Sequence, residues 1–204
     1  MPLSPDDFFA NALSAADDDG RVGLSGITRW DIFPFEQDGL RVAPLHAPVL
    51  PEPARHGEDP ATCRNCREGD DLVIWQDDTW RLMVAPEPSG APLILMLTPK
   101  QHFDVGDLPA ELAAQLGLIV IQTARAIESL EHIARAHVSR WGDGGAHLHI
   151  LFFARPEGFV QLRGTCLAIW DDLLAPVPRE IRDADATRVG EILGASLGGS
   201  PRAL

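Results

Sequence analysis

Residues 144–153 read Gly-Gly-Ala-His-Leu-His-Ile-Leu-Phe-Phe, a glycine loop that runs directly into an apolar stretch. This composition predicts a strand over residues 147–153. Because side chains alternate along a strand, His147, His149 and Leu151 would share one face of it. Two histidines that face the same way beside a glycine loop are unusual in a sheet. A purely structural role stays open, but it requires a polar partner for each imidazole.

The elements before this stretch alternate between strand and helix patterns. Residues 136–141 predict a strand that leads into the glycine loop 142–145. A helix is predicted from about Leu108, with Asp107 as its N-cap, because apolar residues recur at helical spacing as far as Leu130. Further upstream, residues 93–97 predict a continuous apolar strand. Residues 72–75 and 80–84 predict a hairpin that turns at residues 76–79.

The two ends of the chain have different patterns. Residues 4–16 begin with a capping-box pattern and predict a helix, whereas residues 20–62 are proline-rich and predict an extended arm. Residues 164–170 read as a loop or an extended segment, and residues 182–197 predict a closing helix. This order indicates an α+β fold with an antiparallel sheet packed against a long helix. We expect a helix and arm over residues 1–62 and a domain with a C-terminal helical extension over 63–204.

Composition excludes several classes of function. The 204 residues carry a formal net charge of −13, which disfavours binding to nucleic acid or to a membrane surface. No run of about 18 apolar residues predicts a transmembrane helix, and the acidic start lacks the basic region of a signal peptide. Three cysteines are too few for a secreted disulfide scaffold. We therefore expect a cytoplasmic protein.

Two of the cysteines form the motif Cys63-Arg-Asn-Cys66. Two thiolates at this spacing can hold one metal ion and provide half of a tetrahedral zinc site. A redox pair is the alternative, but such a motif should open a helix after a strand, whereas this one follows the proline-rich arm. His102, just past the apolar strand, would by itself be read as an exposed loop histidine.

Taken together, these motifs resemble the histidine triad (HIT) superfamily. The resemblance rests on an apolar strand ending in Pro-Lys-x-His (residues 99–102), a long helix, a glycine-rich loop and the His-Leu-His strand, in that order. The upstream Cys-x-x-Cys is similar to zinc-bearing members and to the related galactose-1-phosphate uridylyltransferases. The matching region runs from about Cys63 to Pro156.

The resemblance implies roles for individual residues. Cys63, Cys66, His102 and His147 match the positions that hold zinc, and a closed Cys₂His₂ set is typical of a structural site. His149 matches the nucleophile, which attacks the α-phosphorus of a nucleotide and forms a nucleotidyl-histidine. The family also implies a nucleotide or nucleoside-diphosphate ligand and a possible homodimer. Residue chemistry, apart from the resemblance, selects the candidate phosphate- and nucleotide-binding residues. Backbone N–H groups at Gly144 and Gly145 could hold a phosphate, Trp141 could stack on a base, and Arg155 could supply a positive charge.

The sequence departs from the family at two positions. Leu151 occupies the third triad position, where hydrolases have histidine and the uridylyltransferase branch has glutamine. Gly144 stands where many members have a polar residue. The leading interpretation is a HIT-type hydrolase or nucleotidyltransferase. The alternatives are a non-catalytic HIT-like protein that binds a nucleotide or a partner, and a hydrolase whose zinc ion activates water, which requires an open coordination position.

Overall fold

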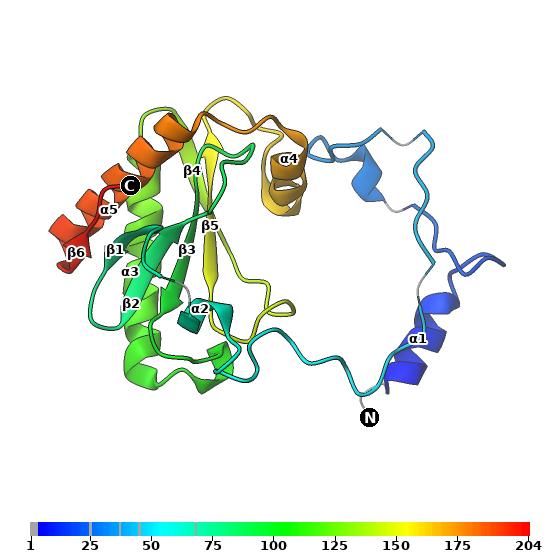
Figure 1. Ribbon diagram of the computed structural model, residues 1–204. Coiled ribbons are helices and arrows are strands. Elements are labelled where there is room, and N and C mark those ends of the chain that lie inside the picture. Colours follow the sequence, from blue (N-terminus) through cyan, green and yellow to red (C-terminus); the bar gives the residue numbers. More distant parts are fainter. Residues whose placement is uncertain (1–3, 25, 37, 45, 68) are drawn as a thin grey trace. The chain divides into compact units, whose positions relative to one another are not determined.

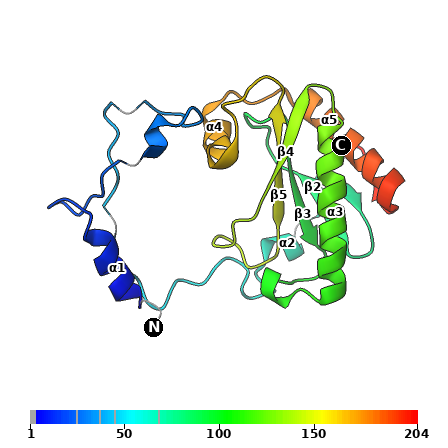
Figure 2. The ribbon, with the colours of Figure 1, turned by 180° about the vertical axis from the view of Figure 1, so that it is seen from behind.

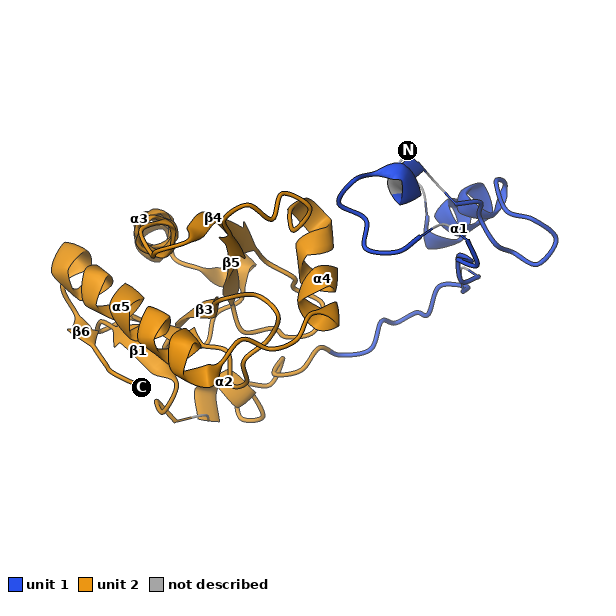
Figure 3. Cartoon of the chain, turned by 90° about the horizontal axis from the view of Figure 1, so that it is seen from above, with its two compact units in different colours: residues 1–54 blue, residues 55–204 orange. Residues whose placement is uncertain are grey.

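The structure is a computed structural model that describes residues 4–24, 26–36, 38–44, 46–67 and 69–204. The chain forms two compact units, residues 1–54 and 55–204 (Figure 3). The second unit therefore includes residues 55–62, which the sequence analysis assigns to the arm.

Unit 1 contains the helix α1 (Pro5–Leu13) and the 3₁₀ helix η1 (Gly26–Arg29). The predicted capping box is confirmed, because the Ser4 hydroxyl accepts a hydrogen bond from the Asp7 N–H and the Asp7 carboxylate accepts one from the Ser4 N–H. The described residues from 30 to 54 include no helix or strand, as their proline content predicts.

Unit 2 is built on a six-stranded sheet with the order β4-β5-β3-β2-β1-β6, in which every neighbouring pair is antiparallel (Figure 1). The predicted α+β class with an antiparallel sheet is thus confirmed. In chain order the strands are β1 (Val73–Gln76), β2 (Trp80–Val84), β3 (Ile94–Pro99), β4 (Ile133–Ser139), β5 (Ile150–Pro156) and β6 (Ser200–Pro201).

One face of the sheet is covered by the long helices α3 (Ala110–Glu128) and α5 (Arg179–Leu197) (Figures 1 and 2). Alternating strand residues such as Leu95, Leu97 and Phe152 are fully buried against them. Among the described helices, α3 alone is long and apolar enough by composition to cross a membrane. The buried apolar residues of α3 belong to the core of unit 2. The core helix of a globular domain can have the same length and composition as a membrane-spanning helix.

Two of the predicted strands have different limits in the structure. The strand β5 begins at Ile150, so His147 and His149 lie on the segment that enters it. Loops hold this segment, because the Ala146 N–H donates to the His56 carbonyl and the Leu148 N–H donates to the Phe103 carbonyl. β4 covers residues 133–139 instead of 136–141, and it ends before the glycine loop.

The helical predictions also need corrections. Residues 164–170, predicted to be a loop or extended, form the 3₁₀ helix η3 (Gly164–Cys166) and most of the helix α4 (Leu167–Leu173). A helix this short carries too little periodicity to be recognised, and tertiary packing determines it instead. Asp107 does not cap α3, because it belongs to the 3₁₀ helix η2 (Val105–Asp107) and Pro109 takes the N-cap position.

Candidate metal centre and histidine site

Four side chains from separate parts of unit 2 meet at one point. Cys63 immediately precedes the short helix α2 (Arg64–Arg67) and Cys66 lies within it. His102 follows β3, and His147 precedes β5. One ligand atom from each of the four lies within 4.8 Å of all the others. The structure thus brings together the complete set that the resemblance implies, and this set can hold a metal ion.

The distances within the cluster match those of a tetrahedral zinc site. The Nδ1 atom of His147 lies 3.5 Å from the Sγ atom of Cys63 and 3.4 Å from that of Cys66, and His102 Nδ1 is also 3.4 Å from Cys66 Sγ. Zinc bonds of about 2.3 Å to sulfur and 2.0–2.1 Å to nitrogen, at tetrahedral angles, place sulfur and nitrogen about 3.5 Å apart. The residues present therefore fit a zinc ion.

The His147 ring is oriented so that Nδ1 can serve as a ligand atom. Its Nε2 lies 2.9 Å from the Pro99 carbonyl oxygen. A carbonyl only accepts hydrogen bonds, so Nε2 carries the proton and Nδ1 keeps its lone pair. Burial lowers the pKa of His147, which favours the neutral imidazole that metal coordination needs.

His149 has the opposite arrangement of its two ring nitrogens. Its Nδ1 lies 2.9 Å from the His147 carbonyl oxygen and therefore donates the proton. The lone pair is then on Nε2, and this nitrogen can act as a nucleophile or a base. The same residue, His147, thus contributes its ring to the metal cluster and its carbonyl to the orientation of His149.

A cavity of about 190 Å³ connects these features. His149, the metal-cluster residues Cys63 and His147, and the predicted phosphate-binding residue Gly145 line it. Four further lining residues were not predicted as site residues: His56, Arg64, Asn65 and Met96. Gly145 lies beside the His149 ring, since a Cβ atom added at Gly145 would lie 3.8 Å from the Cε1 atom of His149.

His56 reaches the site through backbone pairing. Residue 56 forms a parallel bridge with Gly145, and the His56 Nε2 accepts a hydrogen bond of 3.2 Å from the Arg64 N–H. No local sequence signal reveals this pairing, because it joins two loops nearly ninety residues apart in the chain.

An ionic network holds the glycine loop. The Asp104 carboxylate accepts hydrogen bonds of 2.8 Å from Arg55 and from Arg140, and Arg55 also donates to the Gly142 carbonyl. Burial alone would raise the pKa of Asp104, but the Val105 N–H and the two guanidinium groups together lower it. The Arg140 guanidinium is thus paired with Asp104.

The remaining predicted site residues lie in different places. Gly144 is exposed in the loop and pairs its carbonyl with the His56 N–H, whereas Gly145 lines the histidine cavity. Arg155 lies in β5, five residues past Ile150 and hence roughly 17 Å along the strand, and its guanidinium donates to the Pro156 and Phe159 carbonyls. Trp141 is half exposed and lines another cavity.

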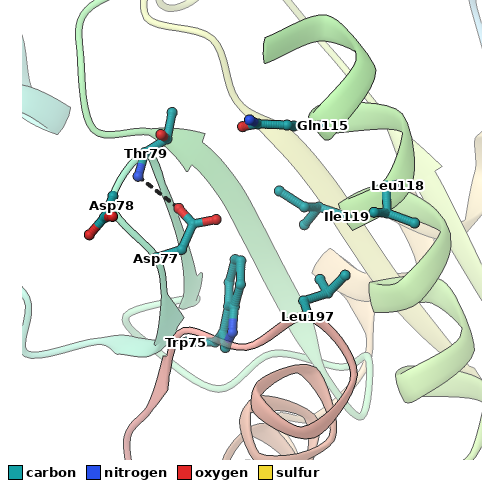
Figure 4. Close-up of a pocket in the computed structure, with 8 residues that line it drawn as sticks. All are labelled: Trp75, Asp77, Asp78, Thr79, Gln115, Leu118, Ile119 and Leu197. Atoms are coloured by element: carbon teal, nitrogen blue, oxygen red, sulfur yellow. Dashed lines mark hydrogen bonds between the residues drawn. The ribbon is translucent and has the colours of Figure 1, made fainter. Parts of the chain in front are cut away.

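A further cavity, of about 320 Å³, lies between the β1–β2 turn, α3 and the end of α5 (Figure 4). The Asp77 carboxylate in it accepts hydrogen bonds from the Thr79 and Trp80 N–H groups and so caps the hairpin turn. The eight described residues drawn around it include no histidine or cysteine, so this cavity is not part of the metal and histidine site.

No protein-family model matches the sequence, and no curated protein matches it. Among solved structures, the chain is similar to a HIT-like protein involved in cell-cycle regulation from Bartonella henselae (17% identity, 69% of this chain and 100% of that one, TM-score 0.49).

It is also similar to a zinc-bound histidine triad protein from Mycobacterium smegmatis (21% identity, 62% of this chain and 83% of that one, TM-score 0.41). A uridylyltransferase matches at 19% identity over 67% of this chain and 46% of that one, with a TM-score of 0.46. These three solved structures are thus two histidine triad proteins and a uridylyltransferase.

Proposed function

We propose that this protein is a HIT-type enzyme that hydrolyses or transfers the nucleotidyl group of a nucleoside-diphosphate compound through His149. One observation carries the proposal. The His149 ring donates Nδ1–H to the His147 carbonyl at 2.9 Å, which leaves the Nε2 lone pair available in a cavity beside the metal cluster.

The proposed reaction has two displacements at the same phosphorus. The Nε2 atom of His149 forms a bond to the α-phosphorus while the bond from that phosphorus to the leaving-group oxygen breaks. The leaving group departs as an oxyanion and takes the electron pair of the broken bond. A water molecule or an acceptor phosphate then displaces the imidazole; water loses its proton to solvent, and neutral His149 is restored.

Zinc is the metal that we propose for the Cys63, Cys66, His102 and His147 cluster. When bound, it would cross-link α2, the end of β3 and the approach to β5, with no open coordination position. The chain itself does the positioning: the Pro99 carbonyl orients the His147 ring, and the His147 carbonyl orients His149.

A non-catalytic nucleotide-binding protein is the second candidate, and Leu151 favours it. This residue is half-buried among apolar side chains, and it cannot donate a proton or a hydrogen bond to a leaving group.

A leaving group that is stable as an anion, such as pyrophosphate or a sugar phosphate, does not need that proton. We therefore propose such compounds as substrates, in preference to nucleoside phosphoramidates.

The test uses the full-length, zinc-loaded protein. It is incubated with dinucleoside polyphosphates, nucleoside-diphosphate sugars and nucleoside phosphoramidates, and products are separated by liquid chromatography. His149→Ala is compared with wild type, and His46→Ala, which removes an exposed histidine of unit 1, is the matched control. Acid-quenched samples are digested and analysed by mass spectrometry for a nucleotidyl group on His149.

Turnover that is lost in His149→Ala and kept in His46→Ala, with an adduct on His149, supports the enzyme. If all three proteins fold, hold zinc and turn over no compound, the binding-protein candidate replaces it. Turnover of phosphoramidates alone would contradict the proposed substrate class, because their amine must be protonated to leave.

A further inference from the structure

The segment Arg55-His56-Gly57 is built into the wall of the histidine cavity, although the proline content of residues 20–62 predicts only an extended arm there. Arg55 donates to the Gly142 carbonyl and forms an ion pair with Asp104. The His56 N–H donates to the Gly144 carbonyl at 3.3 Å, and the His56 carbonyl accepts from the Ala146 N–H at 3.0 Å. The glycine loop thus holds one side of the segment.

The other side of the segment packs against the metal cluster. Gly57 is buried with a φ of +78°, and a Cβ atom added there would lie 3.2 Å from the Sγ atom of Cys63. Glycine permits both this backbone conformation and this close approach. The backbone of His56 is therefore fixed between the glycine loop and the residues that would hold the metal.

The His56 ring is oriented by a contact of its own. Its Nε2 accepts a hydrogen bond of 3.2 Å from the Arg64 N–H, so this nitrogen carries no proton. In the neutral ring the proton is then on Nδ1, which makes no hydrogen bond within the part of the chain that the structure describes. Because Arg64 lines the same cavity, the contact holds the ring at the cavity wall with a donor available to a ligand.

His56 lies close to the proposed nucleophile. A Cβ atom added at Gly145 would lie 3.8 Å from the Cε1 atom of His149 and 4.0 Å from the His56 carbonyl oxygen, so both atoms lie within 4.0 Å of one point. The Nε2 atom of His149 is bonded to that same Cε1 atom. A phosphoryl group on this nitrogen is therefore within reach of the side chain of residue 56.

Two other polar side chains in the lining are less suited to bind this phosphoryl group. The His147 ring donates Nε2–H to the Pro99 carbonyl, and its Nδ1 belongs to the metal cluster. The Asn65 side chain makes no hydrogen bond to the described residues that would hold it in one orientation. A donor stabilises a transition state most when it is already held in place before the reaction, and the His56 ring meets this condition.

We infer that His56 is a further catalytic residue of the proposed reaction, and that its Nδ1–H donates a hydrogen bond to a non-bridging oxygen of the transferred phosphoryl group. The inference rests on the proposed function, because it takes the α-phosphorus to be at His149 Nε2. His56 transfers no proton in this role: if Nδ1 lost its proton while Nε2 accepts from Arg64, an imidazolate would remain. The role therefore requires a leaving group that departs as an anion.

The test compares wild type with His56→Phe and His56→Asn, all full-length and zinc-loaded. Phenylalanine keeps a planar ring without a donor, whereas the asparagine amide can donate from near the place of Nδ1. His46→Phe, which changes an exposed histidine of unit 1, is the matched control. Isothermal titration calorimetry measures the affinities for UMP and AMP, and for uridine and adenosine, which lack the phosphate. Zinc content and melting temperature check the folding of each variant.

We expect wild type to bind at least one monophosphate more tightly than its nucleoside. His56→Phe should weaken that monophosphate about 3- to 10-fold, for one lost hydrogen bond, and leave any nucleoside affinity unchanged. His56→Asn should keep most of the affinity, and His46→Phe should match wild type. In turnover, His56→Phe should lower kcat about 10²-fold, the lower end of the range for one oxyanion donor, because His56 is exposed to solvent.

A second measurement reads the His56 ring of the wild-type protein directly. Long-range proton–nitrogen correlation spectra at mildly alkaline pH, where imidazoles are neutral, show which ring nitrogen carries the proton. The signals that disappear in His56→Asn identify His56. We expect the proton on Nδ1, and we expect the monophosphate to shift the Nδ1 signal. A proton on Nε2 instead, or a signal that the monophosphate does not move, overturns the inference even if His56→Phe fails to fold.

The remaining outcomes separate this inference from the enzyme proposal. An adduct on His149, together with wild-type affinity and turnover in His56→Phe, overturns the role of His56 and keeps the enzyme. Monophosphate binding that depends on His56, without any adduct or turnover, supports the hydrogen bond to phosphate and overturns the enzyme. Equal losses of nucleoside and monophosphate affinity in His56→Phe would show a structural role, and monophosphates that bind wild type no better than nucleosides would exclude a phosphate site; either result overturns the inference.

Discussion

Removal of one thiolate from the metal cluster should abolish zinc binding and lower the melting temperature. Cys66→Ser is the most informative change, because Cys66 is exposed and its side chain contributes little to packing. Its Sγ atom nevertheless lies 3.4 Å from the Nδ1 atoms of both His102 and His147. The variant therefore tests coordination more directly than replacement of the buried Cys63.

The size of the effect follows from linkage. A metal ion that binds only the folded state, at a free concentration 100 times its Kd, adds about 2.7 kcal/mol to the free energy of unfolding. For a domain of about 150 residues, 1 kcal/mol shifts the melting temperature by about 2–4 °C. Cys66→Ser should therefore melt about 5–11 °C below the zinc-loaded wild type.

Two measurements check this prediction. Elemental analysis should find one zinc per wild-type chain and none in Cys66→Ser, and calorimetry with and without a chelator should show a large shift for wild type only. Cys166→Ser, which alters a buried cysteine outside the cluster, should keep both its zinc and its response to the chelator. One equivalent of zinc in Cys66→Ser, or a wild-type melting temperature that ignores the chelator, would refute the assignment.

Three further changes test other parts of the site. Asp104→Asn should lower the free energy of unfolding at pH 7 by about 1.5–3 kcal/mol. The folded-state pKa of Asp104 lies below its ordinary 3.8, so the difference from wild type should be complete above about pH 5 and should shrink as acid denaturation is followed below it. Gly145→Ala should keep wild-type stability, because its Cβ meets nothing closer than 3.8 Å, whereas Gly145→Val should reduce turnover by crowding His149, as steady-state kinetics would report. Gly90→Ala should cost about 1–3 kcal/mol in denaturant unfolding, because its Cβ would lie 2.5 Å from the Leu174 side chain.

Local sequence patterns predicted the features that depend on interactions between residues close together in the chain. The capping box at Ser4 and Asp7 satisfies helix N–H groups within one turn, and the hairpin of β1 and β2 turns at Asp77 as its polar residues indicate. The apolar run of β3 predicted a central strand, and Leu95 and Leu97 are indeed fully buried. The metal cluster came from the resemblance, because spacing alone could not join His102 to Cys66.

Features that depend on long-range contacts were not predictable. His56 enters the histidine cavity because its backbone pairs with Gly144–Ala146, and no periodicity in residues 20–62 signals such a bridge. The helix α4 was missed for a related reason: Leu167 and Ala168 pack in one cluster with Phe153, a contact between distant parts of the sequence. The same packing creates the wall of the cavity beside Trp141, so the part of the fold that was mispredicted is the part that shapes this cavity.

The packing of α4 also accounts for the leucine at position 151, which the resemblance aligns with the third triad position. Leu151 lies between His149 and Phe153 on the same face, and it packs with Ala91, Phe153, Leu162 and Leu167 in a cluster that a polar side chain would disrupt. Once this cluster forms, position 151 can contribute an apolar floor but no proton. A reaction at His149 then depends on a leaving group that is stable as an anion. Leu151 thus links the packing on this face of the sheet to the proposed substrate class.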